Sequence, residues 1–447
     1  MKTITRILLV LVLSGLSPLT LWSQTGAKPN IIFILADDLG WGDLGCYGSD
    51  KIKTPNIDRL AAEGMRFTSA YCGTSVCAPS RAALMTGLHM GHNPIRANRE
   101  IEPEGQAPLP NGTVTVAQLL KDAGYKTATM GKWGLGFPGS GSEPTDRGFD
   151  FNFGYNCQRE AHHYYPEHLW RNKERVELDG RTYSHDLIAD EAIKWMQANT
   201  AQPFFLYLAF TIPHAQYETP DLGIYADKPW PDVEKRVAAM VTRMDRSIGQ
   251  LLDALKQAGA DRNTLIFFAS DNGAMGSNGG HQLEFFDSTG PWRGFKRSMY
   301  EGGLRVPAIA WWPDKIKAGQ VNDTPWAFWD FLPTAVDVAG AKLPPSFKTD
   351  GISIKPLLLG KRLPKREYLY WELHERYFQQ ALRMGDWKAV RPSINQPVEL
   401  YNLKTDPAET RDVAARYPAL AQKMIALMQS ARTDSPDWPI KPPPEKK

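Results

Sequence analysis

Apolar runs rich in β-branched and aromatic residues alternate with segments of helical period along most of this chain. Five such runs are candidate strands, and they cover residues 31–35, 126–130, 203–210, 264–269 and 306–312. Helical patterns begin between them at four points, namely Asn56, Thr115, His185 and Lys235. Strands that alternate with helices predict an α/β fold in which helices sandwich a large and mostly parallel central sheet.

The pattern changes towards the C-terminus. Short strand-like segments such as YLYWEL and ALRMGDWKAVR replace the long runs, and a helical segment follows over residues 418–431. We therefore expect one large domain over residues 25–365 and a smaller α+β subdomain with a short antiparallel sheet over residues 366–437. Residues 438–447 are rich in Pro and Lys and predict a loose tail.

The N-terminus has the pattern of an export signal. Lys2 and Arg6 precede an apolar run from Ile7 to Leu13, which is too short to span a bilayer. Residues 1–24 are therefore interpreted as a signal peptide, and a buried N-terminal helix is the alternative. This predicts a periplasmic or secreted protein with no stable membrane anchor.

Charge and cysteine content exclude some classes of protein. The chain has 52 basic and 49 acidic residues, a net charge of +3, and its basic residues are interleaved with acids, which argues against a nucleic-acid partner. Only four cysteines are present, and none forms a C-x-x-C pair, so we expect at most one disulfide and no zinc site. The cysteines are Cys46, Cys72, Cys77 and Cys157.

Strongly polar side chains follow four of the predicted strands. In open α/β sheets, ligands bind beyond the carboxyl ends of the strands, so these residues are candidates for a common site. In strand order they are Asp37 and Asp38, then Lys132, then His214, and finally Asp271 and Asn272.

Two adjacent aspartates repel each other unless a cation or a proton relieves the repulsion. Asp37 and Asp38, with Asp271 and Asn272 from another strand, would offer hard oxygen ligands, which suit calcium or magnesium. The alternative is that each aspartate only caps the helix or loop that follows it.

Basic residues are expected at the same edge. Lys132, Lys296 and Arg81 around a metal indicate an anionic substrate, such as a sulfate or phosphate ester. His214 would serve as a general acid or base there. Taken singly, Lys296 could be a solvated loop lysine and His214 a core histidine bonded to the backbone.

With these residues in place, the chain resembles the type I, formylglycine-dependent sulfatases of the alkaline-phosphatase superfamily. The most specific motif is CAPSRAALMTG, which is similar to the family's signal for oxidising the cysteine, here Cys77, to formylglycine. PNIIFILADDLGWGDLGCYG, GKWGLG, SDNG, the K-x-x-x-x-E-G-G-x-R-x-P segment from Lys296 to Pro307, and ELYNLKTDPAETRDVA also resemble family motifs.

The resemblance implies a role for each matching residue. Asp37, Asp38, Asp271 and Asn272 would hold calcium together with an oxygen of the modified Cys77, and residues 25–365 would form the catalytic domain. Arg81 would stabilise the hydrated aldehyde, Lys132 and Lys296 would bind sulfate oxygens, and His214 would protonate the leaving alcohol. One hydroxyl of the geminal diol would attack sulfur, and the other would later expel sulfate by re-forming the aldehyde. A formylglycine-generating or radical maturation enzyme would be a required partner.

The chain departs from the family pattern at Gly134, where the family usually has the histidine that accepts the proton for sulfate release. His162 and His163 are the candidates for a substitute base, and two surface histidines near an aromatic cluster are the alternative.

Aromatic and charged loops predict a sulfated carbohydrate as the substrate. Residues 162–172 and 279–292 combine rings that can stack on sugars with groups that can bind hydroxyls. His281 and Arg293 in or beside the second loop are further candidates for substrate binding. A galactose or N-acetylgalactosamine sulfate is expected.

The alternatives are a phosphodiesterase or phosphonate hydrolase of the same superfamily, a catalytically silent protein that binds sulfated glycans, and an aryl or choline sulfatase.

Overall fold

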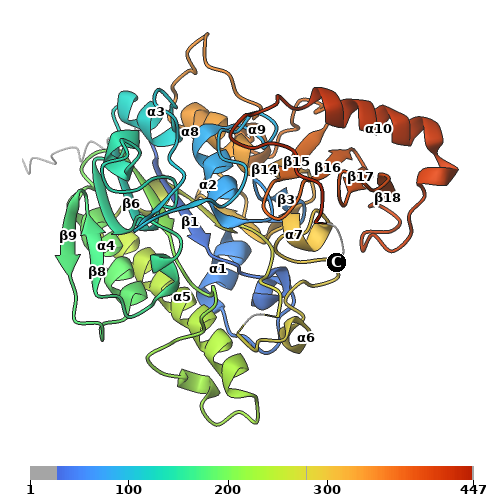
Figure 1. Ribbon diagram of the computed structural model, residues 1–447. Coiled ribbons are helices and arrows are strands. Elements are labelled where there is room, and N and C mark those ends of the chain that lie inside the picture. The colour runs from blue at the N-terminus through green and yellow to red at the C-terminus, as the bar shows by residue number, and fades with distance from the viewer. Residues whose placement is uncertain (1–27, 278, 445–447) are drawn as a thin grey trace, which may run out of the picture.

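The computed structural model describes residues 28–277 and 279–444 (Figure 1). The expected signal peptide, residues 1–24, lies outside the described residues. Within the described part of the chain, no helix combines the length and the apolar character that a membrane span requires.

A ten-stranded sheet forms the centre of the large domain. Its middle strand, β1 (Asn30–Ala36), is buried along its whole length and pairs in parallel with β10 (Phe204–Ala209) and β11 (Thr264–Ser270). The parallel region continues from β10 into β6 (Lys126–Lys132) and β7 (Phe151–Tyr155). Five neighbouring strands therefore run in one direction, and their carboxyl ends meet at one edge of the sheet.

Antiparallel pairing begins on both sides of this parallel region. On one side lie β8 (His168–Arg171) and β9 (Glu174–Glu177). On the other side, β12 (Ala308–Trp311) runs antiparallel to β11 and continues into β2 (Met65–Phe67) and β13 (Gln320–Asn322). Because β12 is reversed, the segment before it, which contains Lys296, arrives at the edge where the parallel strands end.

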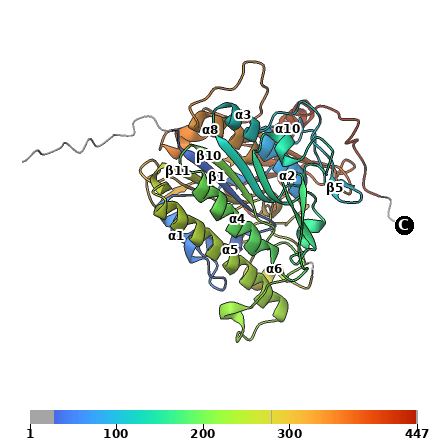
Figure 2. The ribbon, with the colours of Figure 1, turned by 90° about the vertical axis from the view of Figure 1, so that its left-hand side faces the viewer.

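Helices cover both faces of the sheet, as the sequence predicts. One face carries α1 (Pro55–Glu63), α4 (Ser184–Ala198) and α5 (Asp232–Gln257), of which α4 and α5 lie in front of the strands in Figure 2. The opposite face packs against α2 (Cys77–Thr86), α3 (Val116–Asp122) and α8 (Phe331–Val338). Alternate residues of β1 belong to these two cores, which explains why the strand is apolar throughout.

Shorter elements occupy the loops. Two small two-stranded sheets pair β3 (Ala70–Tyr71) with β14 (Trp326–Ala327) and β4 (Glu100–Ile101) with β5 (Gly105–Gln106). Three one-turn helices are α6 (Leu283–Phe286), α7 (Glu301–Leu304) and α9 (Lys355–Leu358).

A four-stranded antiparallel sheet and one helix form the C-terminal part of the chain (Figure 1). They are β15 (Leu369–Leu373), β16 (Gln379–Met384), β17 (Trp387–Arg391), β18 (Glu399–Asn402) and α10 (Pro418–Ser430). The short antiparallel sheet was predicted. The segment from Trp438, expected to be loose, is held at two points: the Trp438 indole donates to the Pro94 carbonyl, and the Phe378 amide donates to the Lys441 carbonyl.

A buried group of ion pairs joins the C-terminal sheet to the large domain. The Lys388 ammonium of β17 lies 2.8 Å from a Glu301 carboxylate oxygen and 2.9 Å from a Glu409 carboxylate oxygen, and all three side chains are inaccessible to solvent. Glu301 begins α7, just after the loop that carries Lys296. The C-terminal sheet therefore supports the segment that delivers Lys296.

Candidate active site

The strand register brings the predicted polar residues to one edge of the sheet. Ala36 pairs with Ser270, and Ala209 pairs with both Leu35 and Gly131. The residues that follow β1 and β11, and the last residue of β6, therefore emerge together.

Cys77 is the first residue of α2 and points into this edge. Its side chain is buried, with Sγ 3.5 Å from an Asp37 carboxylate oxygen and 3.3 Å from the Lys296 ammonium. Burial raises the pKa of the Cys77 thiol to about 12, although Lys132 and Lys296 act in the opposite direction. The unmodified residue is therefore a protonated thiol at neutral pH, which is a poor nucleophile. None of the four cysteines is in a disulfide.

Each of the three buried aspartates is matched by a cation. The Lys132 ammonium lies 2.6 Å from Asp37, the Lys296 ammonium lies 2.7 Å from Asp38, and the Arg81 guanidinium lies 2.8 Å from Asp271. Burial raises the pKa of the Asp37 carboxyl, but Lys132, His214 and Arg81 together hold it well below its usual range. Burial, helped by the Asp37 charge, raises the pKa of Asp271 to about 6.

The donor set fits a hard divalent cation. The Asn272 side-chain nitrogen donates to Asp38, at 2.7 Å, which leaves the Asn272 Oδ1 atom buried and without a hydrogen-bond partner among the described residues. An unpaired amide oxygen beside three carboxylates is the kind of ligand set that binds calcium or magnesium. Ligand atoms of Asp37, Asp38, Cys77 and His214 also lie within 4.8 Å of one another.

Two histidines line the same place. The His214 Nε2 atom lies 3.3 Å from an Asp38 oxygen, and the His162 ring stacks on the His214 ring at 3.5 Å. The His162 Nε2 atom is 3.2 Å from the Lys132 ammonium. Burial lowers the pKa of His214 to about 4 and holds the pKa of His162 well below its usual value, so both rings are neutral at neutral pH.

The structure places three other candidates away from these groups. The His163 side chain is exposed. His281 is buried, with Nδ1 2.6 Å from a Glu234 oxygen. Arg293 donates to the Tyr401 hydroxyl and the Glu409 carbonyl, both at 2.9 Å, so its guanidinium is engaged with the C-terminal part of the chain. None of the three lines the cavity beside Cys77.

This cavity has a volume of about 480 Å³. Its lining includes Cys77, His162, His214 and Lys296, which the sequence pointed to. It also includes residues that sequence reasoning missed, namely Asn98, Gln106, Gln158, Arg159 and Arg297. Arg297 could have been found because it is adjacent to Lys296, and Gln158 and Arg159 because they belong to the histidine-rich segment. No sequence feature indicated that Asn98 or Gln106 would line the cavity.

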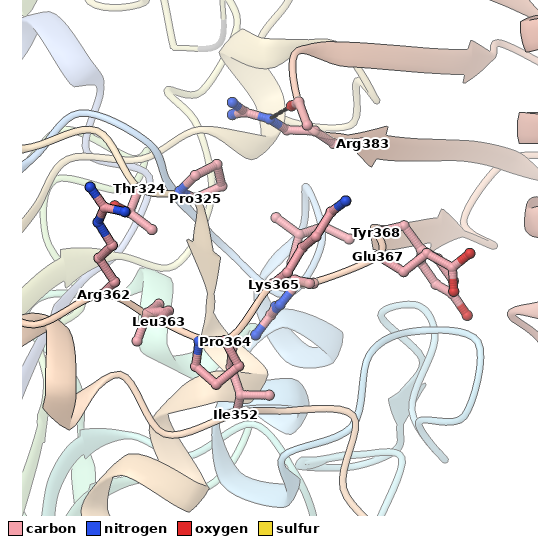
Figure 3. Close-up of a pocket in the computed structure, with 13 residues that line it drawn as sticks. Thr324, Pro325, Ile352, Arg362, Leu363, Pro364, Lys365, Glu367, Tyr368 and Arg383 are labelled. Atoms are coloured by element: carbon pink, nitrogen blue, oxygen red, sulfur yellow. Dashed lines mark hydrogen bonds between the residues drawn. The ribbon is translucent and has the colours of Figure 1, made fainter.

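A second cavity of about 430 Å³ lies between the segment 362–368 and β16 (Figure 3). Four basic side chains line it, namely those of Arg362, Lys365, Arg366 and Arg383. Glu367 is the one carboxylate in its lining, and the groups of three or more possible metal ligands among the described residues lie elsewhere, so the cavity beside Cys77 is the candidate active site.

Comparison with known proteins shows the family of the chain. The profile of the Sulfatase family matches residues 29–341. The chain belongs to the sulfatase family. It is therefore a sulfuric ester hydrolase of the alkaline-phosphatase superfamily. A second profile, N-sulphoglucosamine sulphohydrolase, C-terminal, matches residues 290–434 of this sulfatase.

Individual relatives are similar over most of their length. The N-acetylgalactosamine-6-sulfatase of Canis lupus familiaris is 34% identical over 416 residues, which cover 86% of this chain and 75% of the relative. Arylsulfatase G of Rattus norvegicus is also 34% identical, with 97% of this chain and 93% of the relative covered. A crystal structure of Ps i-CgsB in complex with k-i-k-neocarrahexaose has a TM-score of 0.81 and 32% identity, and covers 90% of this sulfatase and 92% of that chain.

Proposed function

We propose that this sulfatase hydrolyses a sulfate ester on a glycan, with Cys77 matured to formylglycine. The observation that carries the proposal is the setting of Cys77: a buried, protonated thiol at a helix N-terminus, in contact with Asp37 and Lys296. A thiol held in this form has little use as a nucleophile, whereas an oxygen nucleophile at the same place would face two lysines suited to a sulfate group.

The matured residue would supply a hydrated aldehyde, whose hydroxyl can attack sulfur and whose carbonyl can re-form to release sulfate. Around it, Lys132 and Lys296 bind the sulfate oxygens and offset the charge that builds on them. The Arg81 guanidinium, held against Asp271, orients the matured residue from a rigid position.

Two histidines would move protons at opposite ends of the reaction. His214, next to Asp38, protonates the oxygen of the leaving alcohol. His162 takes the place of the histidine that the family usually has at Gly134, because its Nε2 atom reaches the Lys132 ammonium and its ring lies on that of His214. Because both rings are neutral at neutral pH, each would first accept a proton, and His214 would donate to the leaving oxygen only a proton taken up earlier in the reaction, such as the one released by the attacking hydroxyl.

Calcium would be held by Asp37, Asp38, Asp271 and Asn272 together with an oxygen of the matured residue 77, and would act as a Lewis acid towards the sulfate group. The unpaired Asn272 oxygen supports this ligand set. Chelation should lower the Tm of the purified protein, and calcium should restore it more fully than magnesium. A Tm that does not respond to either treatment would remove the metal from the proposal.

A galactose or N-acetylgalactosamine sulfate is proposed as the substrate. Support comes from N-acetylgalactosamine-6-sulfatases at 34–35% identity, and from the structural neighbour whose crystals hold k-i-k-neocarrahexaose. The N-terminal pattern over residues 1–24 supports export to the periplasm or beyond.

The decisive experiment is mass spectrometry of the peptide that contains Cys77, in active protein purified from its native host. We expect the aldehyde or its hydrate at residue 77 and an unmodified thiol at Cys46, which serves as the internal control. The Cys77→Ala variant should lose turnover of sulfated oligosaccharides. An intact thiol at residue 77 in fully active protein would overturn the mechanism.

A further inference from the structure

The cavity beside Cys77 is lined by amides as well as by charged groups. Gln106 of β5 and Gln158, which follows β7, both belong to its lining. The lysines and histidines already account for the sulfate group and the proton transfers. The two glutamines have no part in that chemistry.

Both glutamines are buried with unpaired polar atoms. Gln158 is 7% exposed, and neither its Oε1 nor its Nε2 atom has a hydrogen-bond partner in residues 28–277 and 279–444. Gln106 is 2% exposed, and its Oε1 atom also has no hydrogen-bond partner among the described residues. A buried polar atom without a partner costs about 1–3 kcal/mol, so three of them in one cavity wall call for a ligand.

Gly134 provides the space for the Gln158 amide. The glycine has a φ of +71°, and a Cβ atom added to it would lie 2.5 Å from the Gln158 Nε2 atom. Any other residue at position 134 would displace the amide. Because the terminal torsion of glutamine is broad, the amide can rotate towards a bound molecule in this space.

The chemistry of an amide indicates what the two side chains bind. An amide donates and accepts hydrogen bonds without a net charge, which matches a hydroxyl group and not a second sulfate. An anionic group would be expected to contact the basic residues of the cavity instead.

We propose that Gln106 and Gln158 are specificity-determining residues that bind uncharged hydroxyl groups of the sugar that carries the sulfate ester. This inference rests on the proposed function and deepens it, because it assigns the sulfate and the sugar ring to different residues. A site built to bond a hydroxyl rejects ligands that lack it, since its buried polar groups then stay unpaired.

Binding to the inactive Cys77→Ala protein tests the inference without depending on maturation. The ligands are galactose 4-sulfate, galactose 6-sulfate and inorganic sulfate, and affinity is measured by calorimetry. We expect the better sugar sulfate to bind more tightly than inorganic sulfate, and Gln158→Met or Gln106→Met to reduce its affinity about tenfold, the loss of one hydrogen bond. The affinity for inorganic sulfate should stay within about twofold.

Gln202→Met is the matched control, because Gln202 is exposed and does not line this cavity. The inference is overturned if the sugar sulfates bind no more tightly than inorganic sulfate, if the variants leave their affinity unchanged, or if the variants weaken both kinds of ligand equally. Failure of the proposed function has a separate signature, an intact thiol at residue 77 of active protein.

Discussion

At the scale of single residues, the proposals for the region of Gly134 depend on two side chains, Gln158 and His162. The Gln158 amide lies in the space beside the glycine, and the His162 Nε2 atom lies 3.2 Å from the Lys132 ammonium. The Gln158 amide and the His162 imidazole therefore both line the cavity beside Cys77. The role of each of these two side chains can be tested by mutation.

His162→Gln should lower kcat by about 10²–10⁴, the usual contribution of a general base, with a smaller effect on KM. The matched control is His163→Gln, which changes the adjacent but exposed histidine and should leave both constants unchanged. Steady-state kinetics with a sulfated oligosaccharide provide the measurement. Equal effects of the two substitutions would count against His162 as the substitute base.

Gly134→Ala should destabilise the protein by two separate effects. A positive φ costs alanine about 1–2 kcal/mol, and the new Cβ atom meets the Gln158 amide. In a Gln158→Ala background only the first effect remains, so the destabilisation should be smaller. Urea unfolding of the four proteins gives the interaction free energy, and strict additivity would show that the two side chains do not compete for space.

At the scale of elements, the packing of α4 against α5 contains a titratable contact. His185 of α4 is fully buried, with Nε2 3.1 Å from the Ser247 hydroxyl of α5. Burial lowers the pKa of His185 to about 3, so the ring is neutral in the folded protein over the pH range in which the unfolded chain would protonate it.

The folded state therefore binds fewer protons than the unfolded state between pH 3 and about 6.5. The stabilising contribution of the neutral ring is present above this range and is lost as the pH falls through it. His185→Gln should flatten the fall in unfolding free energy between pH 6.5 and pH 4, relative to His163→Gln as the control. Parallel stability curves for the two variants would contradict this account.

Strand order explains why much of the site could be predicted from the sequence. Asp37, Asp271 and Lys132 were predictable because carboxyl ends of parallel strands share an edge, and the register of β1, β6 and β11 brings these residues together. The choice between His162 and His163 depends on the path of one loop, and adjacent residues carry no signal for it. Arg293 and His281 have suitable chemistry, but tertiary contacts with Glu409 and Glu234 engage them elsewhere.

At the scale of the whole molecule, the C-terminal sheet contacts two segments that flank the candidate active site. Lys388 connects it to α7, and two further hydrogen bonds join β15 to the loop before Cys77: the Trp371 indole donates to the Cys72 carbonyl, and the Thr74 hydroxyl donates to the Glu372 carbonyl. The predicted division near residue 365 therefore marks a change of architecture, and extensive contacts cross it.

Lys388→Met should destabilise the protein by about 3–5 kcal/mol, because it leaves Glu301 and Glu409 buried without their shared cation. Lys404→Met is the control, since Lys404 is exposed on the same subdomain. Thermal unfolding followed by calorimetry gives the difference. A single transition that shifts to lower temperature is expected, and an unchanged Tm would show that the triad contributes little.

The burial of Cys77 also has a consequence for timing. Every residue of α2 is buried, and Cys77 itself is 2% exposed. On the proposed mechanism, an enzyme that oxidises residue 77 would need access to the segment around it, and this access is lost once α2 has packed into the fold. On the same mechanism, folding and maturation would compete kinetically, and a molecule that folds first would remain in the inactive thiol form. The fraction of active molecules in a preparation would then depend on the rate of maturation relative to the rate of folding.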